Sequence, residues 1–231
     1  MYKTGRVGFR MVEATLDAMN YCRNLDYDYF LLLSGQCYPI KPLRVIKQEL
    51  EKKNVAFIEY FKLPSTVHWV HEQGGLDRIK YYTIYLGKQE LPIRIPRLNR
   101  NLPYHLEPYG GSYWSCLPKR FVDYVLDYVS NHPKIVNFYK YCHMPGEMFF
   151  QTIIMNSALK CDVVNDDRRY IPWPSSPAEP GGHPAILRKE DFNQIMRSGK
   201  LFARKFDATI DNDILDLIDG EIQQDRSVGQ I

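Results

Sequence analysis

Apolar residues recur along the first third of the chain in two alternating patterns. From about residue 9 to 21, Met11, Leu16 and Met19 follow a helical spacing, which predicts a first helix after Gly8. Residues 29–33 form a continuous apolar run between polar segments, a pattern typical of a strand buried on both faces of an α/β sheet. We therefore expect a helix followed by a central strand.

The same alternation continues beyond this strand. Residues 34–39 predict a loop at its carboxyl end, where open α/β sheets place their ligand crevices. Residues 42–53 have amphipathic, lysine-rich helical spacing, and residues 55–58 form a short apolar strand. Strand, helix and strand in this order predict an α/β fold.

The pattern blurs between residues 61 and 105, where glycines, prolines and arginines interrupt it. We expect inserted loops there, around a short helix near residues 76–85. The remaining segments predict a turn and then a strand at 109–116, a strand at 168–173, and helices at 118–129, 146–159, 190–196 and from 211 to 218. The expected architecture is one α/β domain over residues 1–231, with a frayed tail at 220–231.

Composition limits the possible partners. Thirty Lys and Arg against 27 Asp and Glu give a net charge of +3, too small to indicate nucleic acid or an anionic membrane as partner. The five cysteines are odd in number and lack metal-binding or disulfide-scaffold spacing, so we expect reduced thiols. The sequence contains neither a signal-peptide core nor a transmembrane run. This predicts a cytoplasmic or peripheral protein, or one of the Golgi lumen if the sequence is a trimmed piece.

One acid stands at the start of an apolar stretch. Pro145 fixes φ for a first helical turn and Gly146 allows close approach, which places Glu147 near a helix N-terminus. Such a position favours the ionised carboxylate. On these residues alone, an acid that only complements the helix dipole is the more common interpretation, and a catalytic carboxylate is the alternative.

Candidate metal ligands occur in three places but are poorly arranged. Asp26 and Asp28 precede a strand instead of following one, and Asp211 and Asp213 stand where a helix needs an N-cap. The segment 68–72 contains two histidines and a glutamate, without the spacing of a zinc site. We therefore expect no metal and no other cofactor.

A basic pair lies inside an apolar segment near the C-terminus. Arg204 and Lys205 are flanked by Leu201, Phe202 and Phe206, a costly arrangement unless the charges meet an anion or extend to water. Both interpretations stay open on these residues. No Gly-rich phosphate loop or nucleophile elbow is present.

Six short motifs follow one another along the chain, at 29–36, 38–41, 111–114, 145–150, 169–173 and 201–207. The fourth is Pro-Gly-Glu-Met-Phe-Phe and the last is Leu-Phe-Ala-Arg-Lys-Phe-Asp. Together, in this order, they resemble the core-2/I-branching β-1,6-N-acetylglucosaminyltransferases of glycosyltransferase family 14, which also includes the peptide O-xylosyltransferases.

The resemblance implies a GT-A-like, Rossmann-type mixed sheet flanked by helices, and inverting, metal-independent transfer from a UDP-sugar to a glycan acceptor. It assigns Glu147 as the catalytic base, and Lys205 with Arg204 as the residues that neutralise the donor diphosphate. Arg188 is the nearest match to a further basic donor-binding residue. The segment after Gly8 resembles one that more sequence normally precedes, so the first strands, and part of the uridine pocket, are expected to be absent.

Acceptor contacts are expected from aromatic residues and one arginine. Trp114, Tyr170 and Trp173 have rings that could stack on a sugar, although a core role is the common one for any single aromatic. Arg78 matches a basic residue of the family's acceptor-binding loop.

The expected activity is transfer of a sugar to a glycan hydroxyl, with GlcNAc as the first choice and xylose left open. A hydroxyl needs a base to take its proton, and the leaving UDP needs fixed positive charge. Two alternatives stay open: a non-catalytic sugar- or nucleotide-binding relative, and a glycosidase, which the lack of a second carboxylate disfavours.

Overall fold

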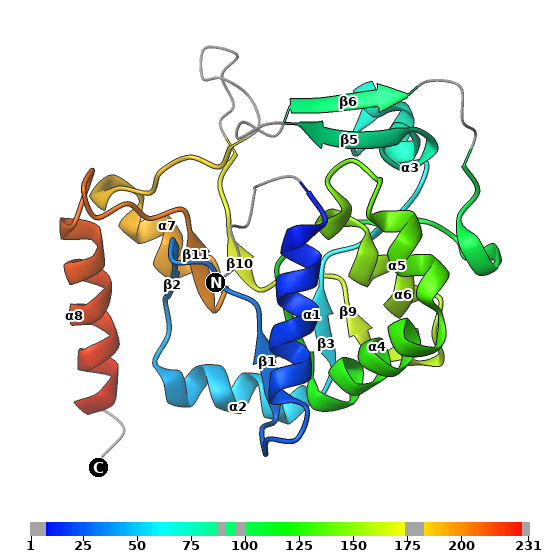
Figure 1. Cartoon of the computed structure of the whole chain (residues 1–231). Coiled ribbons are helices and arrows are strands. Elements are labelled where there is room, and N and C mark those ends of the chain that lie inside the picture. Colours follow the sequence, from blue (N-terminus) through cyan, green and yellow to red (C-terminus); the bar gives the residue numbers. More distant parts are fainter. Residues whose placement is uncertain (1–7, 87–90, 96–99, 174–182, 228–231) are drawn as a thin grey trace. The chain divides into compact units, whose positions relative to one another are not determined.

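A computed structural model describes residues 8–86, 91–95, 100–173 and 183–227 (Figure 1). The chain divides into two compact units, each described by itself: Met1–Leu31 with Val55–Asp167, and Leu32–Asn54 with Arg168–Ile231. Both units combine helices with strands, which confirms the α/β class with mixed sheets. The predicted single domain over 1–231, with inserted loops at 61–105, stays a prediction.

The first unit is built on a mixed sheet of four strands in the order β1 (Tyr29–Leu31), β8 (Ser115–Pro118), β3 (Ala56–Ile58) and β9 (Val163–Val164). β8 runs antiparallel to both neighbours, whereas β3 and β9 are parallel. The prediction that residues 29–33 form a central strand is wrong, because β1 is an edge strand with half-buried residues and ends at Leu31. β3 and β8, which are buried throughout, occupy the centre instead.

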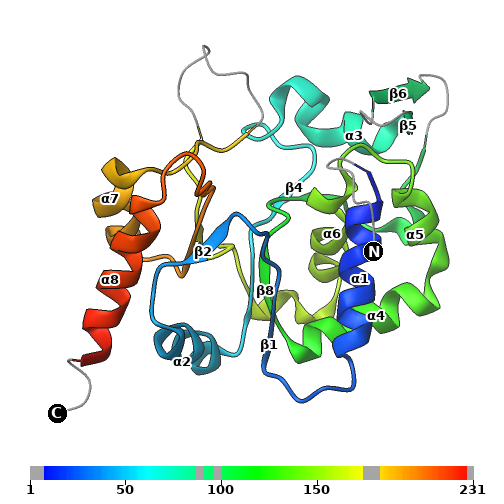
Figure 2. The ribbon, with the colours of Figure 1, turned by 60° about the vertical axis from the view of Figure 1, so that its left-hand side comes forward.

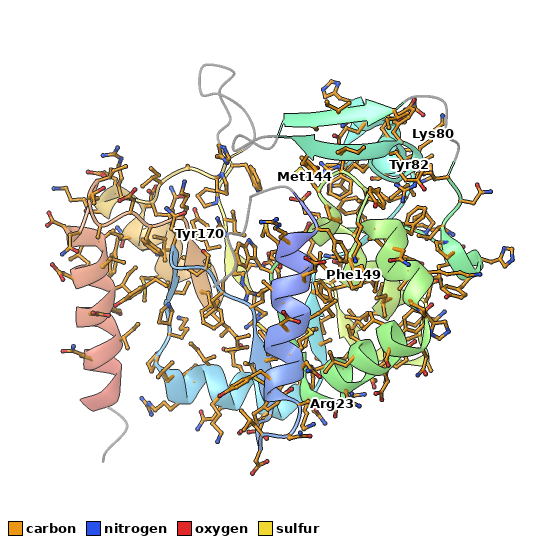
Figure 3. The ribbon with its side chains drawn as sticks, viewed as in Figure 1. Arg23, Lys80, Tyr82, Met144, Phe149 and Tyr170 are labelled. Atoms are coloured by element: carbon orange, nitrogen blue, oxygen red, sulfur yellow. The ribbon has the colours of Figure 1, made fainter. Side chains whose placement is uncertain are left out.

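Four helices of this unit supply most of its core: α1 (Arg10–Cys22), α4 (Lys119–Asn131), α5 (Pro133–Tyr139) and α6 (Phe149–Met155). Every residue of α6 is buried, beginning with Phe149, which Figure 3 labels. Phe149 packs edge-to-face against Phe9, Tyr139 and Phe150. The predicted helix 146–159 is longer than the observed one. It stops at Met155 because the Asn156 side chain donates to the backbone oxygens of Glu107 and Thr152, which holds the chain in a turn.

Residues 61–105 contain more regular structure than the predicted loops. β4 (Phe61–Lys62) pairs with β7 (Tyr109–Gly110), and the 3-10 helix η1 (Val70–Gly75) leads into α3 (Leu76–Lys80). A hairpin of β5 (Tyr82–Leu86) and β6 (Leu91–Ile95) follows, and η2 (Pro103–His105) comes after it. The predicted helix 76–85 therefore ends at Lys80. Thr83 shows why: its side chain is buried and its N–H donates to Tyr141 O, so the segment is bound as a strand.

The second unit has a three-stranded sheet in the order β10 (Arg169–Tyr170), β11 (Phe202–Arg204) and β2 (Cys37–Pro39). Residues 34–39, predicted as a loop, thus include a strand. Around the sheet lie α2 (Leu43–Lys53), η5 (Lys189–Asp191), α7 (Phe192–Arg197) and α8 (Asp213–Ser227); α7 and α8 lie side by side (Figure 2). α8 continues through Ser227, past residue 220, where the sequence predicts a frayed tail.

The core of this unit is separate and smaller. Its buried members are aliphatic and aromatic side chains from β11, from α7 and α8, and from the segments next to the strands and helices: Ile40, Leu187, Ile195, Ala203, Phe206, Ile214 and Ile218. All five cysteines of the chain are free. None of the helices in the described ranges has the length and apolar character needed to cross a membrane.

Candidate active site

Glu147 lies in a separate turn just before α6. The 3-10 helix η3 (Pro145–Glu147) begins after Met144, whose φ is 46°, and Met148 breaks the path to α6 with φ −139° and ψ −31°. A non-glycine residue at positive φ is strained and persists only where its surroundings hold it. The acid therefore belongs to a constrained turn, not to the first turn of α6 as predicted.

Two glycines hold this turn in place. A Cβ atom on Gly146 would lie 2.8 Å from the Tyr113 ring, so a larger residue does not fit without a shift. Gly111 donates its N–H to Glu147 O over 2.9 Å, and a Cβ atom there would lie 1.9 Å from Glu59 O. The close approach expected at Gly146 is present, and the segment leading to Trp114 lies beside the acid.

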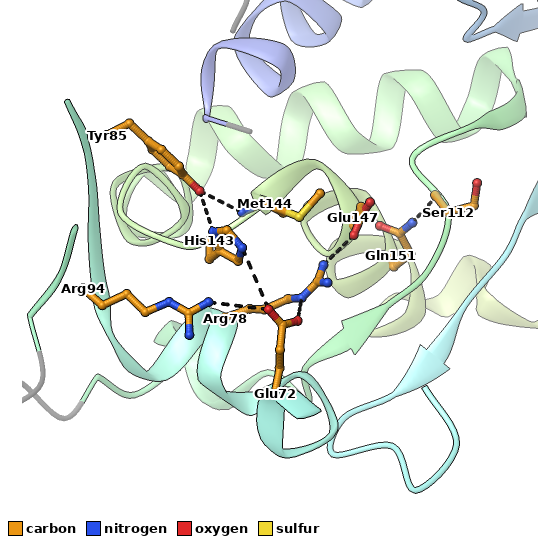
Figure 4. A network of polar contacts seen from close by, with 9 residues as sticks. All are labelled: Glu72, Arg78, Tyr85, Arg94, Ser112, His143, Met144, Glu147 and Gln151. Atoms are coloured by element: carbon orange, nitrogen blue, oxygen red, sulfur yellow. Dashed lines mark hydrogen bonds and ion pairs between the residues drawn. The ribbon is translucent and has the colours of Figure 1, made fainter. Parts of the chain in front are cut away.

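Arg78 binds Glu147 through one carboxylate oxygen (Figure 4). Its Nη1 lies 2.5 Å from Glu147 Oε2. Glu147 Oε1 has no hydrogen-bond partner among the described residues, and 30% of the Glu147 side chain is exposed. One oxygen is thus held by a cation while the other stays available.

Arg78 itself is almost fully enclosed, with 8% of its side chain exposed. Its Nε donates to Glu72 Oε2, and its guanidinium carbon lies 3.6 Å from the centroid of the Trp69 ring. Cβ atoms on Gly75 and Gly110 would lie 2.6 Å and 2.4 Å from that ring, so both glycines make room for it. Arg78 is therefore fixed along one edge and one face.

Glu72 extends the network outward. Its Oε1 lies 3.5 Å from Arg94 Nη2 and 3.9 Å from His143 Nε2. His143 Nδ1 is hydrogen-bonded to Tyr85 OH at 2.8 Å, and Tyr85 OH also accepts from Met144 N–H. Burial, helped by Arg94 and Arg78, lowers the pKa of His143 to about 4 against the opposing charge of Glu72. The imidazole is accordingly neutral at pH 7.

Burial also sets the ionisation of Glu147. Although part of the side chain is exposed, desolvation raises the pKa of this carboxyl above its ordinary value; the charge and hydrogen bond of Arg78 act against the rise, and Glu72 adds to it. The expectation that a helix N-terminus would favour the charged form is wrong, because Glu147 lies outside α6 and desolvation dominates. A raised pKa brings the carboxylate closer to the basicity that a general base needs.

The segment 68–72, considered as a metal candidate, has other partners. His68 stacks on Phe61 with ring centroids 4.1 Å apart, and Glu72 pairs with Arg78. Within the described ranges no three His, Cys, Asp or Glu side chains are grouped so that they could hold a metal ion. Sequence reasoning missed Glu72 and Trp69 as partners of Arg78; the glycine pairs at 74–75 and 110–111 were the available signal for a tightly packed ring.

The predicted donor-binding residues all lie in the second unit. Arg204 ends β11, opposite Cys37 of β2, and Lys205 follows through a cis peptide bond. Leu187 N–H donates to Lys205 O over 2.9 Å, which brings the segment of Arg188 beside that of Lys205. Arg188 is exposed, and Arg204 and Lys205 are half-buried. This backbone hydrogen bond thus brings the chain segments that carry the three basic residues together.

The predicted acceptor-binding residues are divided between the units. Arg78 and Trp114 belong to the first unit with Glu147, and Arg78 contacts the acid directly. Tyr170 and Trp173 belong to the second unit, where Tyr170 OH donates to Gln194 and Trp173 is 62% exposed. An acceptor role for these four residues stays a prediction.

Known proteins resemble the chain over most of its length. It is 29% identical to beta-glucuronosyltransferase GlcAT14A of Arabidopsis thaliana over 222 residues, 93% of this chain and 47% of that protein. GlcAT14B of the same plant is 29% identical over 202 residues, 85% of this chain and 44% of the relative. Human xylosyltransferase 1 is 28% identical over 212 residues, 84% of this chain and 21% of the relative.

The chain therefore spans less than half the length of these relatives. A family model described as Core-2/I-Branching enzyme matches residues 2–196, a range that includes Glu147, Arg78 and Glu72. The chain belongs to the Core-2/I-Branching enzyme family of glycosyltransferases.

Proposed function

We propose that this protein is an inverting glycosyltransferase that moves a sugar from a UDP-sugar to a hydroxyl of a glycan acceptor, with Glu147 as general base. The observation that carries the proposal is the unequal occupation of the Glu147 oxygens: Arg78 binds Oε2, and Oε1 has no partner among the described residues. A base needs one oriented, accessible oxygen, and this arrangement supplies it.

Comparison of Glu147 with Glu72 supports the choice of base. Glu72 has Arg78 on one oxygen and Arg94 on the other, with His143 nearby. Both of its oxygens are therefore occupied, which suits a structural role. In the reaction, the acceptor hydroxyl gives its proton to Glu147 Oε1 as its oxygen attacks the anomeric carbon; the bond to the UDP oxygen breaks, and one displacement inverts that carbon.

Positive side chains take the place of a metal in this proposal. UDP gains negative charge as the glycosidic bond breaks, and Lys205 with Arg204 and Arg188 would neutralise it. The backbone hydrogen bond from Leu187 to Lys205 supports this role, because it brings the segment of Arg188 beside that of Arg204 and Lys205. Transfer without a divalent cation is accordingly the proposed mode.

Three sugars are candidates for the group transferred from UDP: GlcNAc, xylose and glucuronic acid. GlcNAc is the first choice from the sequence motifs, whereas the relatives are named for glucuronosyl and xylosyl transfer. A panel of UDP-GlcNAc, UDP-xylose and UDP-glucuronic acid, assayed with and without EDTA, tests donor and metal together. UDP release in EDTA supports the proposed mode, and activity only after adding Mn²⁺ or Mg²⁺ would contradict it.

Substitution of the base tests the central claim. Glu147→Gln keeps the shape but cannot take a proton, so turnover should fall by about 10²–10⁴-fold. Glu107→Gln is the matched control, because Glu107 is exposed and paired with Lys62. Undiminished turnover in Glu147→Gln would remove this residue from its role. UDP binding without turnover of any donor would favour the non-catalytic alternative.

A further inference from the structure

We propose that Glu72 is a positioning residue that holds Arg78 to a single oxygen of Glu147 and so keeps the other oxygen free for the acceptor hydroxyl. This inference rests on the proposed function, because it assumes that Glu147 is the base. Glu72 touches no reacting atom in it and acts through Arg78 alone.

The contact between Arg78 and Glu147 differs from the usual pairing of these side chains. A guanidinium and a carboxylate commonly pair in a two-pronged manner, with two parallel N–H···O bonds that occupy both carboxylate oxygens. Arg78 does not bind Glu147 in this way: Nη1 contacts Oε2, and Oε1 is left without a partner in the described chain. Something must prevent the guanidinium from turning.

Glu72 and Trp69 supply that restraint. Glu72 Oε2 accepts from Nε of Arg78, and the Trp69 ring supports the guanidinium face at 3.6 Å. With one edge and one face held, only an Nη group reaches Glu147 (Figure 4). Without Glu72, the guanidinium could rotate in its plane and engage both oxygens of Glu147.

Glu72 is in turn held from outside. Arg94 of β6 lies 3.5 Å from its Oε1, and His143, bound to Tyr85 of β5, lies 3.9 Å from the same oxygen. The carboxylate is therefore oriented from two elements and only 22% of its side chain is exposed. This second contact explains why Glu72 can fix Arg78 without itself changing direction.

The charge of Glu72 has a separate effect on the acid. The charged groups that act on the Glu147 carboxyl are Arg78 from α3 and Glu72 from η1. Arg94 from β6 and His143 from the preceding loop face Glu72 instead. Glu72 raises the pKa of Glu147. Removing its charge lowers that pKa, so the acidic limb of the kcat profile moves to lower pH.

Two variants separate position from charge. Glu72→Gln keeps an oxygen that can accept from Arg78 Nε but loses the charge; Glu72→Ala loses both. We expect Glu72→Ala to lower kcat by about 10–10²-fold with a smaller change in KM, the size typical of a misplaced catalytic group. Glu72→Gln should recover part of that loss, and its acidic limb should lie at lower pH than in the wild type.

A control variant distinguishes the loss of Glu72 from the loss of any surface carboxylate. Glu107→Gln removes the charge of an exposed carboxylate whose side-chain partners are Lys62 and Tyr109, outside the network, and should leave kcat and the pH profile unchanged. If Glu72→Ala does not fold, Glu72→Gln carries the test through its pH profile. A wild-type profile and kcat in both Glu72 variants overturns the inference.

Failure of the inference differs from failure of the proposed function. If Glu147→Gln is inactive while the Glu72 variants behave as wild type, the base assignment stands and the positioning role is wrong. If Glu147→Gln is fully active, the base assignment itself fails. Titration of the Glu147 carboxyl by 13C NMR adds a readout that needs no turnover: a pKa unchanged in Glu72→Gln would also count against the role.

Discussion

Arg78 contacts Glu147 at Oε2 alone, with Nη1 2.5 Å away, although an arginine and a carboxylate commonly bind through two bonds. The reason lies on the other side of the guanidinium, where Glu72 and Trp69 hold it. Arg78, for which the sequence predicts acceptor binding, thus contacts the proposed base directly.

Replacing Arg78 should affect both stability and pH dependence. Arg78→Gln leaves Glu72 and Glu147 without their common cation, and loss of one partner of a buried pair costs about 3–5 kcal/mol of unfolding free energy. The pKa of Glu147 should rise further, because Arg78 lowers it. Activity should then appear only at higher pH, as measured by a kcat profile.

The control for Arg78 is Arg23→Gln. Arg23 pairs with Asp127 at the surface, where both side chains are more than a third exposed, so its loss should cost only about 0–1 kcal/mol. Equal destabilisation of the two variants in urea unfolding would contradict the special role of Arg78.

Gly146→Ala should destabilise the turn that carries Glu147. The new Cβ would lie 2.8 Å from the Tyr113 ring, an overpacking that costs about 1–3 kcal/mol. Gly220→Ala should instead raise the unfolding free energy. Gly220 has open space around it in α8, and Ala is favoured over Gly in a helix by about 0.5–1 kcal/mol. Thermal unfolding of both variants checks this, and a stabilised Gly146→Ala would refute it.

Lys205→Ala should weaken UDP binding by about 10–100-fold, the equivalent of one lost charge-assisted hydrogen bond. Calorimetry in EDTA measures the affinity. Lys47→Ala on α2 is the control, since Lys47 is exposed and paired with Glu51 one helical turn away. Equal affinity in Lys205→Ala and wild type would exclude Lys205 from donor binding.

His143 should contribute to acid sensitivity of the fold. Its pKa is about 4 in the folded chain against 6.5 in the unfolded one, so the unfolded state binds more protons between these values. Stability is therefore complete above pH 6.5 and falls as the pH drops toward 4, by about 3 kcal/mol. His143→Gln should lose less stability over this range in urea titrations, whereas exposed His105→Gln should behave as wild type.

Local pattern was sufficient to predict much of the fold. α1, α2, α4 and α7 lie within a few residues of the predicted helices, because their apolar spacing and their bounding Gly and Pro residues are properties of consecutive positions. The hairpin from Tyr82 to Ile95 was missed, since its inner strand is selected by a backbone bond to Tyr141, 58 positions beyond Thr83. The prediction that residues 29–33 form a central strand was wrong for the same reason, because an apolar run does not determine which strands it pairs with.

By itself, the sequence determined the α/β class, the family motifs and the identity of Glu147 as the acid worth testing. Only the tertiary structure decided how that acid is held: Arg78 on one oxygen, Glu72 and Trp69 behind Arg78, and a pKa raised by burial instead of lowered by a helix N-terminus. The physical reason is that hydrogen bonds, ring contacts and desolvation depend on distances between elements far apart in the chain. Spacing along the sequence carries no direct record of those distances.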